Sequence, residues 1–283
     1  MFKNNQTKTA LLPLIRNFLA EDLGRGDITG EAIFPSEVMG RAQFIAKEEM
    51  VTAGIEELAP LVFSARNPAI AAKALVGDGA RVAAGTCLLE IAGPVRDLLA
   101  AERVALNLAQ RLCGIATLTA AFVEPVRDLP VQILDTRKTT PGLRLLEKYA
   151  VRMGGGHNHR FNLNDGILIK DNHIAAAGSI AEAVRKVRDY NGLNGPAVEV
   201  ECETIAQVEE ALAAGVEIIM LDNMTPAMMR QAVALVRGRA LLEASGGVRL
   251  DNIRAIAETG VDRISIGALT HSAPAKDISM EMA

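Results

Sequence analysis

The sequence AVEVECETIAQVEEALAAGVEIIMLD, residues 197–222, decides the fold because it contains a strand, a helix and a second strand in succession. Residues 197–202 and 217–222 are short runs rich in β-branched and other apolar side chains, which are typical of buried strands. Between them, residues 205–214 have apolar side chains at the i, i+3 and i+4 spacing of a helix. The stretch therefore predicts two parallel strands joined by a right-handed helical crossover.

The same alternation continues through the second half of the chain. Strands are predicted at residues 131–136, 167–171, 197–202, 217–222, 240–244 and 263–267. Helices are predicted at residues 143–153, 180–190, 205–214, 226–236 and 250–259, with Thr204 and Thr225 as caps. The last four strand ends, at Glu201, Asp222, Ser245 and Gly267, follow each other at intervals of 21, 23 and 22 residues. Such a regular repeat favours a barrel, and because only six strands are visible we expect an open or truncated β/α barrel.

The first half of the chain has a different pattern. Residues 41–52 are predicted as a strand, residues 77–93 as a turn, a strand, a turn and a second strand, and residues 94–123 as one long helix. We therefore expect an α+β domain over residues 1–115 and the barrel domain over residues 116–268. We expect the C-terminal tail, residues 269–283, to pack back on the first domain.

Composition and charge exclude several classes of function. The net charge is −4, the pI is about 5.7, and the chain has no basic tail or repeat, so nucleic acid is not an expected partner. The three cysteines, Cys87, Cys113 and Cys202, are far apart in sequence, which argues against a disulfide framework or a zinc-knuckle spacing. The N-terminal region lacks the long apolar run of a signal peptide or a membrane span. We therefore expect a cytoplasmic protein without a membrane partner.

Polar residues stand where the predicted strands end. These ends are Asp135-Thr-Arg-Lys-Thr-Thr140, Lys170-Asp-Asn-His173, Glu199 with Glu201, Asp222-Asn223, Glu243-Ala-Ser-Gly-Gly247 and Gly267-Ala268. In a β/α barrel the C-terminal ends of the strands form the active site, and a charge buried in such a strand requires a partner or a ligand. A lone aspartate at a strand end is often only a helix cap, but six successive polar ends predict a functional site.

The residues of this predicted site divide by charge. A basic group comprises Arg137, Lys138, His159, Arg160 and Lys170, with Arg103 of the long helix as a further candidate, and an acidic group comprises Glu199, Glu201, Asp222 and Asp171. Arginine forks suit carboxylates, whereas clustered carboxylates suit Mg²⁺ or the hydroxyls of a sugar. Backbone N–H groups near Ser245 and Gly267 are typical of a phosphate site on the last two strands of a barrel. These residues predict a poly-carboxylate and a metal-bound sugar phosphate as ligands.

The sequence RMGGGHNHR, residues 152–160, fits three kinds of site at first sight. A phosphate loop would precede a helix, whereas the glycines at 154–156 follow a predicted helix, where glycine commonly ends helices. His157 and His159 have no further cysteine or histidine close in sequence, which disfavours a transition-metal site. The remaining interpretation is one wall of a carboxylate pocket, in which His157 holds the loop through its own hydrogen bonds.

Six motifs together resemble the quinolinate phosphoribosyltransferase family, also called nicotinate-nucleotide pyrophosphorylase (carboxylating). They are Ala101-Glu-Arg-Val-Ala-Leu-Asn107, Asp135-Thr-Arg-Lys-Thr-Thr-Pro-Gly142, Gly154-Gly-Gly-His-Asn-His-Arg160, Leu168-Ile-Lys-Asp-Asn-His173, Leu221-Asp-Asn223 and Ser265-Ile-Gly-Ala-Leu-Thr-His271. The resemblance covers nearly the whole chain, from Glu21 to the tail. It implies an N-terminal α+β sandwich domain, an open β/α barrel and a homodimer. The implied reaction, with Mg²⁺, converts quinolinate and phosphoribosyl pyrophosphate to nicotinate mononucleotide, pyrophosphate and CO₂ in NAD biosynthesis.

The resemblance also assigns roles to individual residues. The quinolinate site would comprise Arg137, His159, Arg160, Lys170 and Arg103, the last of which comes from the partner subunit in the family. The phosphoribosyl pyrophosphate site would comprise Lys138, Glu201, Asp222, Ser245, Gly246, Gly247 and Gly267, with Glu201 and Asp222 holding the metal directly or through water. The expected catalytic residues are Lys138, Lys170, Glu201 and Asp222. Glu199 also points inward by strand alternation, and its role relative to Glu201 stays open.

Three other functions compete with this prediction. A phosphoribosyltransferase with nicotinate as acceptor would need cations for one carboxylate, whereas the basic group suits two. A Schiff-base aldolase would use Lys170 as its nucleophile, although the surrounding cations and acids do not suit that chemistry. A non-catalytic binding protein would not need the complete set of charged strand ends. Conversion of quinolinate is therefore the principal hypothesis.

Overall fold

The computed structural model describes residues 5–192 and 195–283 of the chain, so residues 1–4 of the predicted first domain lie outside the described residues. By its internal contacts the chain forms two compact units. The first comprises Met1–Ala120, Thr140–Gly155 and Ser272–Ala283, and the second comprises Ala121–Thr139 and Gly156–His271. Residues 140–155 thus group with the first unit, whereas the predicted boundaries assign them to the barrel domain.

The second unit is built on a parallel sheet. Its strands are β6 (Gln132–Leu134), β7 (Ile167–Ile169), β8 (Val198–Cys202), β9 (Ile218–Asp222), β10 (Leu241–Ser245) and β11 (Arg263–Ser265). In space the order is β6-β11-β10-β9-β8-β7, and every pairing in it is parallel. Within the part of the chain that the structure describes, no strand joins β6 to β7, so the barrel is open, as the sequence predicted.

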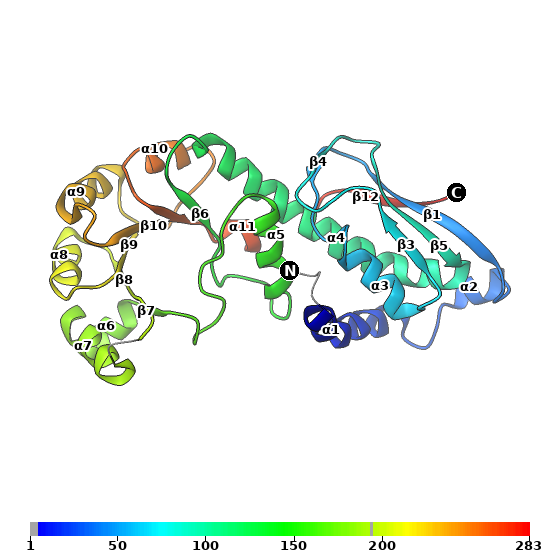
Figure 1. The fold of residues 1–283 in the computed structure, drawn as a ribbon, viewed down its shortest axis with the longest axis horizontal. Helices are drawn as coiled ribbons and strands as arrows, with labels where there is room; N and C mark the ends of the chain where they lie inside the picture. Colours follow the sequence, from blue (N-terminus) through cyan, green and yellow to red (C-terminus); the bar gives the residue numbers. More distant parts are fainter. Residues whose placement is uncertain (1–4, 193–194) are drawn as a thin grey trace. The chain divides into compact units, whose positions relative to one another are not determined.

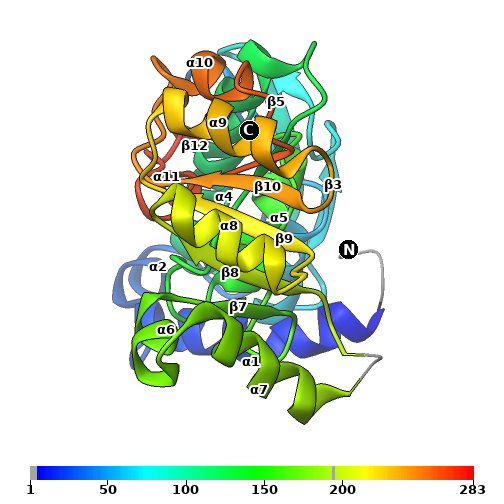
Figure 2. The same ribbon diagram turned by 90° about the vertical axis from the view of Figure 1, so that its left-hand side faces the viewer.

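Helices alternate with these strands. They are α6 (Asp171–Ala177), α7 (Ile180–Asn191), α8 (Ile205–Ala213), α9 (Pro226–Val236), α10 (Ile253–Ala257) and α11 (Ala268–His271), with a short 3₁₀ helix at Glu124–Val126. Figure 2 shows α8 and α9 lying over one face of β8, β9 and β10. The predicted caps are confirmed, because Thr204 accepts a hydrogen bond from the Gln207 amide and Thr225 accepts one from the Met228 amide.

Helix α10 is shorter than the predicted helix at residues 250–259. The Asn252 side chain accepts a hydrogen bond from the Arg249 amide at 2.8 Å, and the Asn252 amide donates to the Arg249 carbonyl at 3.2 Å. These bonds close a turn ahead of Ile253 and compete with helix formation there. The helix therefore begins three residues later than the apolar spacing indicates.

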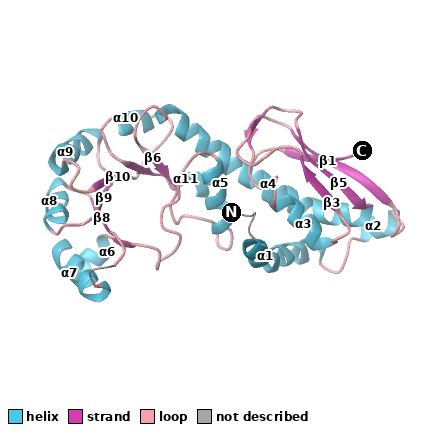
Figure 3. Ribbon diagram, viewed as in Figure 1, coloured by secondary structure: helices cyan, strands magenta, loops and turns pink. Residues whose placement is uncertain are grey.

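The first unit is a sheet covered by helices. Its four-stranded antiparallel sheet has the order β12-β1-β5-β3, with β1 (Met39–Ala46), β3 (Ala71–Ala74), β5 (Cys87–Pro94) and β12 (Ile278–Met282). The helices that begin in this unit are α1 (Asn5–Leu23), α2 (Ile28–Ile33), α3 (Leu58–Arg66), α4 (Val95–Val123) and α5 (Arg144–Met153). Phe44 of β1 is fully buried and meets Phe63 of α3 edge to face, with ring centroids 5.9 Å apart. Sheet and helices thus form the expected α+β sandwich (Figures 1 and 3).

The two strands predicted within residues 77–93 belong to different sheets. Strand β4 (Arg81–Val82) pairs with β2 (Met50–Val51), whereas β5 pairs with β1 and β3. The predicted strand at residues 41–52 is accordingly divided into β1 and β2. The break falls at residues 47–49, where exposed Lys47 and Glu49 pair with Glu281 and Arg81 instead of continuing the ladder.

The C-terminal tail is part of the first unit. Strand β12 pairs with β1 in antiparallel register, from Ala42 opposite Met282 to Ala46 opposite Ile278. The Lys276 amide also donates a hydrogen bond to the Gln110 carbonyl of α4 at 3.0 Å. The last strand of the chain therefore completes the sheet that the first strand begins.

Among the residues that the structure describes, one helix is long and apolar enough to cross a membrane. It covers Val95–Val126, with a mean hydropathy of 1.3 in its most apolar window. More than half of that window, 56%, is buried inside the protein. Such burial is typical of the core helix of a folded domain, so the length and composition are weak support for a membrane span.

Candidate active site

One cavity of about 730 Å³ lies where the strands of the second unit end. Glu199 and Asp171 of the predicted acidic group do not line it. The lining does include every residue of that unit that the resemblance assigns to a substrate, namely Arg137, Lys138, His159, Arg160, Lys170, Glu201, Asp222, Ser245, Gly246, Gly247 and Gly267. The register of the sheet explains this gathering, because Asp222 lies opposite Ser245, and Ser245 lies opposite Ser265. In a parallel sheet the last residues of neighbouring strands lie next to one another at the same edge of the sheet.

Lys170 and Glu201 form an ion pair across neighbouring strands. Lys170 follows β7 directly and is the residue before α6, and its Nζ lies 2.8 Å from Oε2 of Glu201 in β8. The Glu201 side chain is largely buried, whereas that of Lys170 is about half exposed toward the cavity. This pair joins a residue of the predicted quinolinate site to one of the predicted phosphoribosyl pyrophosphate site.

Asp222 ends β9 beside Glu201. Its Oδ2 accepts a hydrogen bond of 2.7 Å from Nδ2 of Asn223, a residue held at a positive φ of 54°. Burial, followed by the negative charge of Glu201, raises the pKa of Asp222 above its ordinary value. Two carboxylates that repel each other at a strand edge are a suitable donor set for a cation with a preference for oxygen.

Arg137 and Arg160 place two guanidinium groups in the same cavity. The Arg160 side chain donates from Nη1 to the Gly166 carbonyl at 3.3 Å. Burial lowers the pKa of Arg160, and the nearby charge of Arg137 lowers it further. Two like charges that approach each other in a partly buried site favour an anionic ligand between them.

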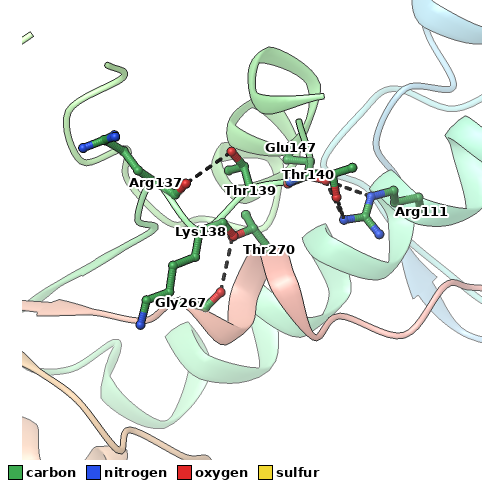
Figure 4. A network of polar contacts seen from close by, with 8 residues as sticks. All are labelled: Arg111, Arg137, Lys138, Thr139, Thr140, Glu147, Gly267 and Thr270. Atoms are coloured by element: carbon green, nitrogen blue, oxygen red, sulfur yellow. Dashed lines mark hydrogen bonds and ion pairs between the residues drawn. The ribbon is translucent and has the colours of Figure 1, made fainter. Parts of the chain in front are cut away.

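Lys138 lies over Gly267, at the end of the last strand. A Cβ atom at Gly267 would lie 2.9 Å from Cδ of Lys138, so only glycine permits this approach without displacement of the lysine. The Thr270 hydroxyl donates to the Lys138 carbonyl at 2.8 Å and approaches the Gly267 carbonyl at 3.3 Å (Figure 4). Arg137 and Lys138, which both line the cavity, extend in different directions in this view.

The loop after β10 requires glycine. Gly246 has a φ of 89°, and a Cβ atom there would lie 2.2 Å from Oδ1 of Asn223. Gly247 has a φ of 62°. Both glycines line the cavity, where a loop without side chains leaves room for a ligand to approach the backbone.

The RMGGGHNHR stretch connects the two units. Gly154 follows α5, and a Cβ atom there would lie 2.3 Å from the Ala116 carbonyl oxygen of α4. The glycine therefore allows the end of α5 to pack closely against α4. His157 forms a parallel bridge with Leu134 of β6 through backbone hydrogen bonds. The buried Asp135 carboxylate then accepts bonds from the His159 amide and from Nδ2 of Asn158, at 2.9 and 2.6 Å.

His159 has protein partners at both ring nitrogens. Nδ1 accepts a hydrogen bond from the Arg160 amide at 2.7 Å, and Nε2 lies 3.1 Å from Oε2 of Glu199 and 3.5 Å from Oε1 of Glu243. Glu199 and Glu243 are both buried. The inward direction predicted for Glu199 is therefore correct, and this residue faces His159, whereas Glu201 faces Lys170.

Arg103 lies in the first unit, outside the cavity described above. It lines a smaller cavity of about 230 Å³ together with Phe18, Glu21, Asp22, Asn107, Arg111 and Leu143. Beside it, Arg111 donates to Oε1 of the buried Glu147 at 2.9 Å and to the Thr140 hydroxyl at 2.7 Å (Figure 4). Within its own unit, Arg103 thus lines a cavity of apolar and charged residues.

The cavity contains residues to which the sequence assigned no role. Thr136, Arg249 and His271 line it, next to Lys138, Gly247 and Gly267 respectively. The signal for Arg249 was available, since it stands two residues after the Ser-Gly-Gly sequence. His271 ends one of the quoted motifs, but only α11 brings its ring to Gly267, where a Cβ added to that glycine would lie 3.2 Å from the ring.

A polar cavity of mixed charge at the strand ends of an open β/α barrel defines an enzyme active site for an anionic substrate. Residues 27–113 match the model of the N-terminal domain of quinolinate phosphoribosyl transferase, and residues 115–281 match that of its C-terminal domain. The chain therefore belongs to the quinolinate phosphoribosyl transferase family.

Individual relatives agree with this assignment. The chain is 47% identical over 272 residues to a probable nicotinate-nucleotide pyrophosphorylase (carboxylating) of Bacillus subtilis, covering 96% of this chain and 93% of that protein. It is 42% identical to quinolinate phosphoribosyltransferase (decarboxylating) 1b of Nicotiana tabacum, covering 95% and 81%. The crystal structure of NadC from Streptococcus pyogenes superposes with a TM-score of 0.93 at 44% identity, covering 97% of each chain.

Proposed function

We propose that this enzyme transfers the phosphoribosyl group of phosphoribosyl pyrophosphate to quinolinate and releases CO₂, giving nicotinate mononucleotide and pyrophosphate for NAD biosynthesis. The family and the names of the relatives support this reaction. The observation that carries it is the composition of the strand-end cavity, where cations, two carboxylates and a glycine loop line one space. A dicarboxylate and a sugar phosphate are the ligands that such a lining suits.

Quinolinate would bind at the cationic side of the cavity. Its two carboxylates need at least two cations, and Arg137, Arg160 and Lys170 supply them. The mutual repulsion of Arg137 and Arg160 would be relieved when a carboxylate lies between them. Positioning by these forks would aim the pyridine nitrogen at the ribose and lower the entropic part of the barrier.

The ribosyl donor would bind at the opposite side. The loop at Gly246 and Gly247 would hold the 5′-phosphate, and Lys138 would face the pyrophosphate. As the bond from C1 to pyrophosphate oxygen breaks and the bond from the pyridine nitrogen forms, positive charge develops on the ribose. Glu201 and Asp222 would stabilise that charge, and Lys138 would stabilise the negative charge on the leaving group.

Decarboxylation would follow on the nucleotide. The ring nitrogen becomes cationic once it carries the ribose, so the electron pair of the breaking carbon–carboxylate bond is stabilised on the adjacent ring carbon. CO₂ leaves, and a proton takes its place on that carbon. This step requires no separate cofactor.

Mg²⁺ fits the acidic side of the cavity. Glu201 and Asp222 are hard oxygen donors. Burial, followed by the charge of Glu201, raises the pKa of Asp222, and a cation would offset that charge. These two residues would hold the ion directly or through water, and the bound ion would neutralise charge on the pyrophosphate.

We also propose a homodimer in which Arg103 completes the site of the partner subunit, as the resemblance implies. The lining of the strand-end cavity agrees with this proposal, because it does not include Arg103. Co-expression of an Arg103→Ala chain with a Lys170→Ala chain tests it. Recovery of activity in the mixture supports the shared site, and two inactive variants that stay inactive together contradict it.

A cytoplasmic location is proposed on the same footing. Its support is the presence of three free cysteines, of which Cys113 and Cys202 are buried. Burial raises the pKa of both thiols to about 12, so neither is a reactive thiolate.

The reaction is tested by supplying quinolinate and phosphoribosyl pyrophosphate with and without Mg²⁺. We expect equal amounts of pyrophosphate and CO₂, and loss of both when the metal is chelated. Nicotinate serves as the comparison acceptor, because it has one carboxylate and cannot release CO₂ in this way. Turnover of nicotinate in preference to quinolinate would contradict the proposal.

A further inference from the structure

A buried cluster lies beneath the cavity and is not used by the steps above. Glu199 of β8, Glu243 of β10 and His159 place their ligand-type atoms within 4.8 Å of one another. Among the described residues, Oε1 of Glu199 has no hydrogen-bond donor, and the buried Ser265 hydroxyl approaches the Glu243 carboxyl and lowers its pKa. Buried carboxylates with so few donors are costly, so their retention calls for a role.

The His159 ring decides what that role is. Nδ1 accepts a hydrogen bond from the Arg160 amide, so its lone pair is occupied and it carries no proton. The ring proton therefore lies on Nε2, where Glu199 Oε2 accepts it at 3.1 Å and Glu243 Oε1 lies at 3.5 Å. The ring is neutral in this arrangement, because a protonated Nδ1 would face the Arg160 N–H.

The same tautomer disfavours a metal ion in the cluster. A metal would need the lone pair of Nε2, which would move the ring proton to Nδ1. A ligating histidine normally donates its other N–H to an acceptor, but Nδ1 here faces a donor. The cluster is thus arranged to orient a ring and not to hold an ion.

We propose, on the basis of the proposed function, that Glu199 is a positioning residue for quinolinate. It holds His159 in the tautomer with the proton on Nε2, and Nδ1 of that ring then fixes the amide of Arg160. The Arg160 guanidinium lines the cavity beside Arg137. Its orientation toward a quinolinate carboxylate therefore depends on the hydrogen bond between the Arg160 amide and His159 Nδ1. Glu243 supports the arrangement as the second, more distant acceptor.

Two variants of Glu199 separate positioning from packing. Glu199→Gln keeps an oxygen that accepts from Nε2, whereas Glu199→Met has a similar length without a strong acceptor. We expect Glu199→Met to raise the KM for quinolinate about tenfold while the KM for phosphoribosyl pyrophosphate stays within twofold, and Glu199→Gln to remain near the wild type. Equal effects of the two substitutions would overturn the proposal.

The tautomer itself is read from ¹⁵N spectra of labelled histidine, which need no turnover. The chain has only four histidines, and a His159→Asn variant assigns the signal of interest. We expect the neutral Nε2–H form in the wild type and in Glu199→Gln, and its loss in Glu199→Met. A protonated ring or the Nδ1–H form in the wild type would overturn the proposal. This outcome does not depend on the stability of Glu199→Met, because it is measured on the wild type.

Metal content provides the last measurement. The protein is incubated with Zn²⁺, desalted and analysed for bound metal, beside Glu199→Gln and Asp222→Ala. Retention of one ion that Glu199→Gln loses and Asp222→Ala keeps would overturn the proposal. A wild type that fails to convert quinolinate would instead contradict the proposed function. The ¹⁵N spectra would still test the tautomer of His159 in that case, because they need no turnover.

Discussion

Nζ of Lys170 lies 2.8 Å from Oε2 of Glu201, across the adjacent parallel strands β7 and β8. Through this contact a residue of the proposed quinolinate site, Lys170, is adjacent to a residue of the proposed phosphoribosyl pyrophosphate site, Glu201. A lysine in an ion pair carries its positive charge, whereas a Schiff-base nucleophile must be neutral. The pair therefore favours Lys170 as an anion ligand over the aldolase interpretation.

Substitution of Lys170 by Met is expected to weaken use of quinolinate. One of its cationic partners is lost and Glu201 is left without its counter-ion, so kcat/KM for quinolinate should fall roughly 10²-fold. Lys186→Met is a matched control, because Lys186 pairs with Glu182 on the surface of α7. Steady-state kinetics measure both. A lysine that borohydride traps with a carbonyl substrate would point back to the aldolase.

Arg137→Ala and Asp222→Ala are expected to separate the two substrates. Arg137→Ala removes a guanidinium from the cationic side and should raise the KM for quinolinate, or lower kcat where the side chain also orients the ring. Asp222→Ala should weaken use of Mg²⁺ and phosphoribosyl pyrophosphate. The KM values for both substrates, determined across a Mg²⁺ titration, check this. If Asp222→Ala affected quinolinate alone, the proposed division of the cavity by charge would be incorrect.

Gly246→Ala is expected to impair binding of the sugar phosphate. Its Cβ would collide with Asn223 at 2.2 Å and would stand at a positive φ, so the loop must move. The KM for phosphoribosyl pyrophosphate should rise at least about tenfold, since the loss of one or two charged hydrogen bonds is involved. Gly238→Ala is the control, since it has a similar backbone strain at φ 73° but open space around it. Equal kinetic effects in both variants would show that strain alone is responsible.

The stability of the protein is expected to depend on pH through Glu243. Burial, followed by the charge of Glu199, raises the pKa of Glu243 from 4.5 to about 7. Between these values the unfolded chain has released this proton and the folded protein keeps it, so rising pH favours unfolding. The stabilising contribution is complete below about pH 4.5 and is lost as the pH rises through about 7.

Glu243→Gln removes this dependence, because an amide does not ionise. The difference in unfolding free energy between Glu243→Gln and the wild type should therefore grow as the pH rises through that range, by roughly 1–3 kcal/mol in favour of the variant. Urea denaturation at several pH values measures the difference. Glu209→Gln makes the same change of charge at an exposed position of α8 and should leave the slope unaltered. A parallel pH profile for wild type and Glu243→Gln would refute the assignment.

Most of the second unit could be predicted from local patterns. Strand β9 is a near-continuous apolar run, as is typical of a buried parallel strand, and helix α8 begins after a capping threonine. The first unit was harder, because β4 and β5 look like consecutive strands of one hairpin and pair with different partners. Pairing of that kind depends on segments far away in sequence, which local spacing does not record.

The sequence by itself determined the order of strands and helices, the polar residues at the strand ends and the resemblance to a family, because each is carried by neighbouring residues. The tertiary structure decided which partner each side chain has. Glu199 and Glu201 stand two residues apart and alternate in the same way, yet one meets His159 and the other meets Lys170. Their difference arises from depth in the barrel and from what the facing loops supply at that depth, and both are set only when the strands come together in register.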